Sequence, residues 1–231
     1  MSAEVKKFIN EYPAPIVQEM MRIFPDGVVI TSGIYALITL SFPFAVMFGS
    51  LVEATLIFHV LRSVSSFLDI VPSSLEKSAY KHICRTGFSD PVESSMGSLS
   101  LFTSILEDSS LLNQFPSSSI YMLSVASSYL FSTLNAQSKE LEALGPNFSS
   151  RYYISMIFLS LLLFTFVCFR LAYSCETFGT VILSVPIGLI IGYLLVLQNQ
   201  RLFGKSSINL LGIPQLKSVS SSGQKINVCL K

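Results

Sequence analysis

The chain has 231 residues, of which 51% are hydrophobic and only 13% are charged. Because roughly 25% of residues are charged in an ordinary soluble domain, a soluble core cannot hide this much apolar surface, and we expect lipid to cover the remainder. The formal net charge is +1, which gives no reason to expect a nucleic-acid partner, because a phosphate-binding surface needs clustered Lys and Arg.

Residues 1–26 carry apolar side chains at helical three- and four-residue spacing, on either side of Pro13 and Pro15, with charged residues between them. This pattern predicts a pair of amphipathic helices. One apolar stripe serves equally well for packing on lipid or on a protein neighbour, so the sequence leaves both open.

Two apolar stretches follow in residues 27–70. Gly27–Val52 is uncharged and long enough to cross a hydrocarbon core about 30 Å thick, which takes about 20 helical residues. We expect Pro43 to kink this first span. Leu51–Ile70 crosses only if its ionisable side chains face other helices, and these are Glu53, His59, Arg62 and Asp69.

Residues 71–115 are polar and charged, which predicts an extramembrane loop or cap with short helices. Residues 116–200 then form a predicted three-helix membrane bundle. Its first helix is serine-rich and begins after Pro116. The other two helices are the uncharged runs between Arg151 and Arg170 and between Glu176 and Arg201.

Small residues recur at four-residue spacing in the first and last helices of this bundle. They are Ser124, Ser128 and Ser132 in the first helix and Ser184, Gly188 and Gly192 in the last. Rows of this kind let two helix backbones approach closely. We expect the two rows to face each other, against the alternative that a Gly-x-x-x-Gly pair occurs by chance in apolar sequence.

Residues 201–231 form a basic, serine-rich tail. No acidic residue follows Glu176, whereas Arg201 and four lysines follow the last apolar run. The positive-inside rule therefore predicts a cytoplasmic C-terminus. If the preceding spans alternate in direction, Pro116 and the Arg170–Glu176 connection lie together on the non-cytoplasmic side of the membrane. Asn147, in the only glycosylation sequon, then lies on the cytoplasmic side, and we expect it to stay unmodified.

Residues suited to chemistry are scarce. The four cysteines lack the spacing of a zinc site or a redox pair. The two histidines, His59 and His82, adjoin no nucleophile motif, and the sequence contains no glycine-rich phosphate loop and no HExxH. We therefore expect no catalytic residue, no metal and no cofactor.

Three short motifs give the chain a resemblance to a known family. They are Lys77 with Arg85, then Pro116–Ser119, and then Phe169–Arg170 before a last helix rich in small residues. In this order they resemble the type-2 phosphatidic acid phosphatase superfamily, whose membrane helix bundle carries its three motifs on one face. The resemblance covers roughly residues 50–195 and implies that Lys77, Arg85 and Arg170 gather a phospholipid headgroup.

The chain departs from this family at the catalytic positions. Thr86 stands where a proline belongs, Ser119 and Glu176 stand where the two histidines belong, and Thr180 replaces an aspartate. A carboxylate at position 176 would repel a phosphate ester and cannot form the family's phosphohistidine intermediate. The resemblance thus implies a related fold in a pseudoenzyme.

We predict an all-α polytopic transmembrane helix bundle with four or five spans and an amphipathic N-terminal segment. The predicted function is that of a non-catalytic structural or anchoring subunit of a larger assembly, a respiratory or transport complex or a large-virus membrane, with membrane lipids and other protein subunits as partners. One alternative is a divergent lipid phosphatase-like bundle that binds phospholipid headgroups. Another is a small transporter or channel that uses Glu53, His59 and Arg62, although Glu53 and His59 lie six residues apart and so fall on different helix faces.

Overall fold

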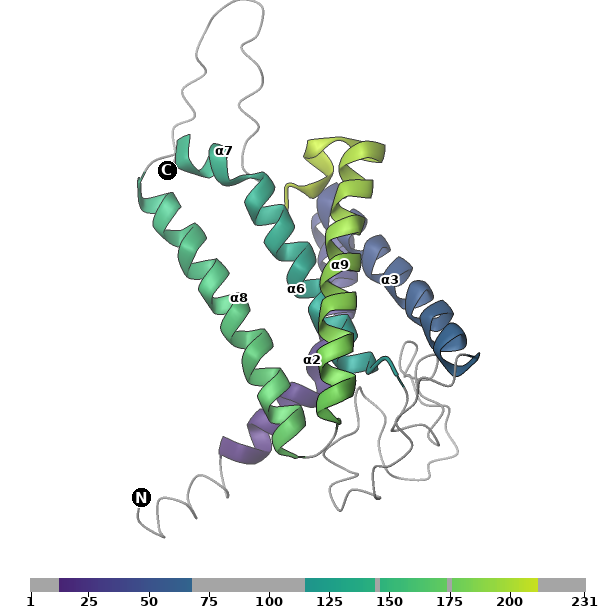
Figure 1. Ribbon diagram of the computed structural model, residues 1–231. Coiled ribbons are helices and arrows are strands. Elements are labelled where there is room, and N and C mark those ends of the chain that lie inside the picture. The colour runs from purple at the N-terminus through teal and green to yellow at the C-terminus, as the bar shows by residue number, and fades with distance from the viewer. Residues whose placement is uncertain (1–12, 68–114, 144–145, 174–175, 212–231) are drawn as a thin grey trace, which may run out of the picture.

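The computed structural model describes residues 13–67, 115–143, 146–173 and 176–211, and the regular structure in these ranges is entirely helical. The long helices are α2 (Pro13–Thr39), α3 (Phe42–Phe67), α6 (Ser118–Ala136), α8 (Pro146–Ala172) and α9 (Phe178–Phe203). A short helix α7 (Ser138–Ala143) and a 3-10 turn η1 (Lys205–Ile208) accompany them (Figure 1).

Three helical segments in the described ranges are long and apolar enough to cross a membrane. They are Phe42–Ser65, Ser150–Ala172 and Phe178–Phe203, and Gly27–Thr39 is a shorter apolar stretch. The all-α class and a multi-pass membrane protein are therefore supported, whereas a total of four or five spans stays a prediction.

The expectation of one kinked span over Gly27–Val52 is wrong. α2 ends at Thr39, Leu40 takes a left-handed backbone with φ of 49°, and α3 begins two residues later. Pro43 therefore stands in the first turn of a new helix, where its missing N–H costs no hydrogen bond and its fixed φ favours the helical backbone. The described part of Leu51–Ile70 continues this same helix.

The two helices form an antiparallel hairpin. The rings of Tyr35 and Phe44 lie 4.5 Å apart near the turn, and a Cβ added at Gly33 would lie 3.0 Å from the ring of Phe48. Glycine at position 33 therefore lets the two helices pack closely. α2 runs without a break from Pro13 into this hairpin, so the expected boundary at residue 26 falls inside a helix.

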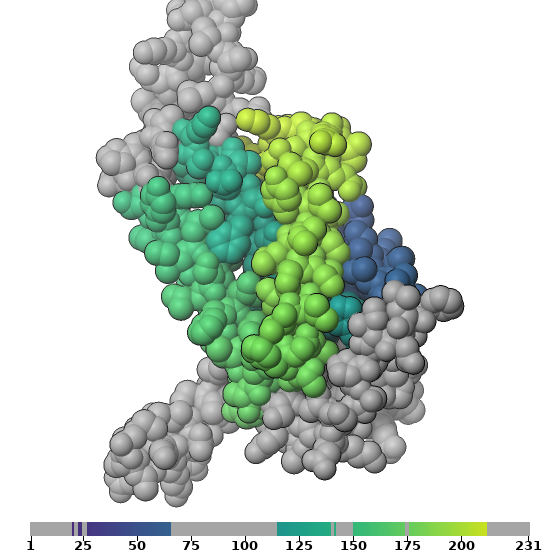
Figure 2. Space-filling view, in the orientation of Figure 1, coloured from purple at the N-terminus to yellow at the C-terminus, as the bar shows by residue number. Residues whose placement is uncertain are grey.

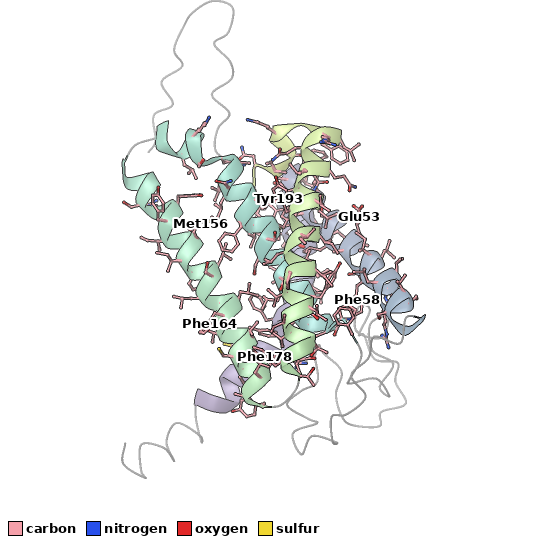
Figure 3. The ribbon with its side chains drawn as sticks, in the orientation of Figure 1. Glu53, Phe58, Met156, Phe164, Phe178 and Tyr193 are labelled. Carbon is pink, nitrogen blue, oxygen red and sulfur yellow. The ribbon has the colours of Figure 1, made fainter. Side chains whose placement is uncertain are left out.

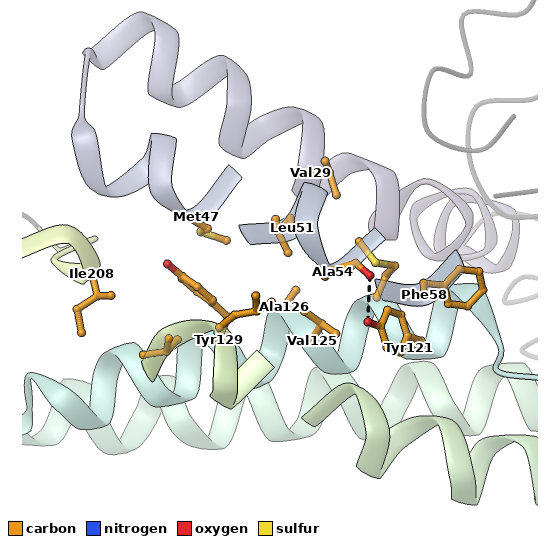
Figure 4. Packing of buried hydrophobic residues seen from close by; sticks show 13 residues of the cluster. Val29, Met47, Leu51, Ala54, Phe58, Tyr121, Val125, Ala126, Tyr129 and Ile208 are labelled. Carbon is orange, nitrogen blue, oxygen red and sulfur yellow. Dashed lines mark hydrogen bonds between the residues drawn. The ribbon is translucent and has the colours of Figure 1, made fainter. Parts of the chain in front are cut away.

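α6 occupies the centre of the bundle and packs against α9, α8 and α3. Every side chain from Ser119 to Tyr129 is buried, although this helix is rich in serine. Its tyrosines 121 and 129 contribute to the core shared with α3, where the Tyr121 hydroxyl donates a hydrogen bond to the Ala54 carbonyl at 3.0 Å (Figure 4).

The surrounding helices expose apolar side chains. α9 runs along one face with α8 and α3 on either side of it (Figure 2). Large exposed side chains include Ile154, Ile157, Phe158, Leu161 and Phe164 of α8 and Ile182, Leu183, Ile190 and Leu194 of α9. A serine-rich centre inside an apolar exterior reverses the pattern of soluble proteins and suits a lipid environment.

The bundle has two ends, which we name after Ser117 and Phe203. At the Ser117 end, the Ser65 hydroxyl donates to the Phe115 carbonyl at 2.7 Å. At the Phe203 end, the rings of Phe42 and Phe203 lie 5.7 Å apart, and the Gln137 side-chain amide donates to the carbonyl of Ile208 at 3.0 Å. Residues 68–114, which include nearly all of the predicted loop or cap, lie outside the described residues.

Candidate functional site

Ser117, Arg170 and Glu176 form a buried polar cluster at the Ser117 end. Ser117 immediately precedes α6, Arg170 lies in the last turn of α8, and Glu176 lies just before α9. Oε1 of Glu176 accepts a hydrogen bond from the Ser117 hydroxyl at 2.6 Å and another from Nη2 of Arg170 at 2.8 Å. The side chains of the ion pair are only 7% and 8% exposed.

Helix ends position each member of this cluster. A cation in the last turn of α8 is stabilised by the negative end of the helix dipole. The Thr177 hydroxyl accepts a hydrogen bond from the backbone N–H of Thr180 at 3.2 Å and so caps α9, which fixes the adjacent Glu176. On the α6 side, the backbone N–H of Ser117 donates to the hydroxyl of Ser184 at 3.0 Å.

In the described structure, the two opposite charges of this cluster are in direct contact. The charges of Arg170 and Glu176 cancel, and a charge-assisted hydrogen bond from Ser117 adds to the carboxylate. A buried ion pair is tolerated only when both charges are compensated in this way. Within the described residues, Glu176 contacts Nη2 of Arg170, and the cluster joins the start of α6, the end of α8 and the segment just before α9.

The sequence-predicted headgroup set is only partly described. Arg170 is placed in the cluster above, whereas Lys77 and Arg85 lie outside the described residues. Of the residues that the structure describes, no three or more His, Cys, Asp or Glu side chains gather as a metal ion would require.

The two rows of small residues lie against each other along α6 and α9. A Cβ added at Gly188 would lie 2.6 Å from Cβ of Ser124, and one added at Gly192 would lie 2.8 Å from Cβ of Ser128. The Ser128 hydroxyl donates to the carbonyl of Leu189 at 2.6 Å. Ser184 is fully buried and accepts the hydrogen bond from Ser117 described above, whereas Ser132 is half-buried at the far end of its row.

A second buried polar cluster lies toward the Phe203 end, and sequence reasoning missed it. Nδ2 of Asn199 donates to the Ser50 hydroxyl at 2.7 Å and to the Tyr129 hydroxyl at 3.1 Å. The Ser207 hydroxyl donates to the backbone carbonyl of Asn199 at 3.3 Å. The asparagine therefore ties α3, α6, α9 and η1 together, and its position at the end of a long apolar run was the available signal.

Glu53 and His59, two ionisable residues of α3, contact different groups in the described structure. The Glu53 carboxylate binds Gln198 of α9 through both oxygens, at 3.0 and 3.1 Å. The ring of His59 instead lies edge-on to Phe58, with centroids 6.0 Å apart. Glu53 and His59 thus have different surroundings, as their six-residue spacing predicts.

Comparisons of the chain with protein-family models, with curated proteins and with solved structures found no match. The resemblance to the type-2 phosphatidic acid phosphatase superfamily therefore stays a prediction from the sequence motifs, and so does the headgroup role of Lys77, Arg85 and Arg170.

Proposed function

We propose that this chain is a non-catalytic, multi-pass membrane protein that acts as a structural or anchoring subunit of a larger membrane-associated assembly. The observation that carries the proposal is the buried cluster of Ser117, Arg170 and Glu176 at the Ser117 end. Glu176 accepts hydrogen bonds from Ser117 and Arg170. Both of these residues belong to motifs that the resemblance would assign to phosphate chemistry. The charge that could have attracted a headgroup is instead used to hold three helices together.

The packing of α6 and α9 gives further support. The spaces beside Gly188 and Gly192 are too small for a Cβ, and the buried side chains of Ser128 and Asn199 fix the register of neighbouring helices. Backbones locked in this way disfavour the sliding motions of a transporter and suit a rigid scaffold. The exposed apolar side chains around this scaffold are available to lipid and to the membrane helices of partners.

Purification in a mild detergent, followed by lysine crosslinking and mass spectrometry, tests the proposal. Lys139 and Lys205 are exposed near the Phe203 end. We expect the chain to be recovered at a fixed ratio to other proteins, with crosslinks from these two lysines to one neighbour. The matched variant Lys139→Arg with Lys205→Arg keeps both charges but removes the reactive amines, so these crosslinks should disappear while the assembly persists. Recovery of a lone chain with bound phospholipid would contradict the proposal.

A further inference from the structure

We infer that Glu53 marks a docking surface on α3 and α9 for a membrane helix of a partner protein that carries a lysine or arginine at the same depth. The inference rests on the proposed function, because it specifies the chemistry of one neighbour within that assembly.

Glu53 lies near the midpoint of the Phe42–Ser65 span. Within the described part of the chain, its carboxylate accepts hydrogen bonds from one group, the neutral side-chain amide of Gln198. Figure 3 shows the residue on α3 beside α9, at the flank of the bundle. The two hydrogen bonds orient the carboxylate, but their donor is neutral, so they do not compensate a negative charge on Glu53.

Exposed apolar side chains lie on both sides of this pair along the helices. Phe42 and Phe203 lie toward the Phe203 end, and Leu56 and Leu194 lie toward the Ser117 end. Glu53 is half-buried and therefore sits within the apolar exterior. A carboxylate in this setting is costly unless a cation accompanies it.

The described residues show elsewhere how this protein neutralises a carboxylate. At the Ser117 end, Glu176 is neutralised by Arg170 at 2.8 Å. A lysine or arginine on a neighbouring helix would complete the equivalent pair at Glu53, and an arginine could bind both carboxylate oxygens.

Glu53 lies in line with a stripe of exposed apolar side chains on α3. Leu56, Val60 and Val64 follow Glu53 at spacings of three and four residues, so the four side chains share one face of α3. The three apolar members are all exposed. This face combines an apolar stripe with one negative charge, which is complementary to an apolar helix with one positive charge.

Site-directed photocrosslinking in native membranes tests the inference. A photoreactive residue at Leu56 of the full-length chain should crosslink to a protein whose contacting membrane helix contains a lysine or arginine. The matched position is Ile157 on α8, which is 60% exposed compared with 63% for Leu56, and it should not capture that helix.

Charge variants then assign the interaction to Glu53. Glu53→Gln keeps the size of the side chain and its hydrogen-bonding capacity, and it should lower the Leu56 product about tenfold or more, because it leaves the partner's cation unpaired. Glu53→Asp should retain most of the product. Arg201 is exposed on α9, one turn beyond Gln198. Arg201→Gln should also retain the crosslinked product, which would show that the partner's cation, and not Arg201, pairs with Glu53. Glu53→Lys combined with a glutamate in place of the partner's basic residue should restore the crosslinked product.

An undiminished product with Glu53→Gln, a captured helix without a basic residue, a second copy of this chain, or lipid alone at Leu56 would each overturn the inference. Recovery of the native assembly together with any of these results would leave the proposed function standing. Failure to recover an assembly would overturn both. Unchanged melting of purified Glu53→Gln would show that a lost crosslink is not a folding defect.

Discussion

Alanine in place of Gly192 would disrupt a close contact between α6 and α9. The added Cβ would lie 2.4 Å from the carbonyl oxygen of Val125, whereas ordinary van der Waals contact begins at 3.4 Å. Because the obstacle is backbone, a side-chain rotation cannot relieve it. The two helices must separate locally by about 1 Å, the difference between these two distances.

The cost has two parts. Overpacking of this kind costs about 1–3 kcal/mol. Separation also weakens the 2.6 Å hydrogen bond from Ser128 to the Leu189 carbonyl, and such bonds between membrane helices contribute about 0.6–1.7 kcal/mol. We expect the free energy of unfolding to fall by about 2–4 kcal/mol, which for a chain of this size corresponds to a Tm lower by about 5–15 °C.

Thermal unfolding of the purified protein in mild detergent, followed by circular dichroism, measures this loss. Gly49→Ala is the matched control, because a Cβ at Gly49 of α3 meets no atom within 4 Å. That variant should melt at or slightly above the wild-type temperature, since alanine is the better helix former. Equal Tm values for Gly192→Ala and Gly49→Ala would refute the close packing of α6 and α9.

Further predictions concern the polar clusters and the topology. Glu176→Gln removes the charge that neutralises Arg170 and should cost on the order of 3 kcal/mol in detergent unfolding, while adding Arg170→Gln should recover part of that loss. An unchanged Tm for the single variant would show that the ion pair between Arg170 and Glu176 does not stabilise the bundle. Asn199→Leu removes two buried side-chain hydrogen bonds and should cost about 1–2 kcal/mol in the same assay, so wild-type melting would show that this cluster is not stabilising. When the chain is expressed in a glycosylating cell, Asn147 should stay unmodified, and a sequon introduced within residues 71–115 should be modified. An endoglycosidase mobility shift measures both. The reverse pattern would show that the predicted topology is inverted.

The lengths of the apolar runs and the spacing of the small residues predicted the last three long helices and the contact between α6 and α9. The start of α6 after Pro116 and the approach of Gly188 and Gly192 to α6 follow directly from local chemistry. The α2–α3 hairpin did not, because a proline in an apolar run is compatible both with a kink and with the first turn of a new helix. In the hairpin, Gly33 packs closely against Phe48 across the turn, which is a tertiary interaction that the local sequence does not reveal.

The polar clusters show the same limit. The motifs placed Ser117 and Arg170 at one end of the bundle, but the sequence treated Glu176 only as a lost histidine. Its actual role depends on a hydrogen bond to a residue 59 positions away. Asn199 binds side chains 149 and 70 positions away, and separations of this size leave no local pattern to recognise.

Native mass spectrometry of the particle extracted in mild detergent tests most directly whether this bundle is a structural subunit. We predict that the 25.4 kDa chain is released from a larger complex that contains other proteins at a fixed ratio. A particle of one chain with bound phospholipid, without other proteins, would contradict the account and favour a lipid-binding bundle.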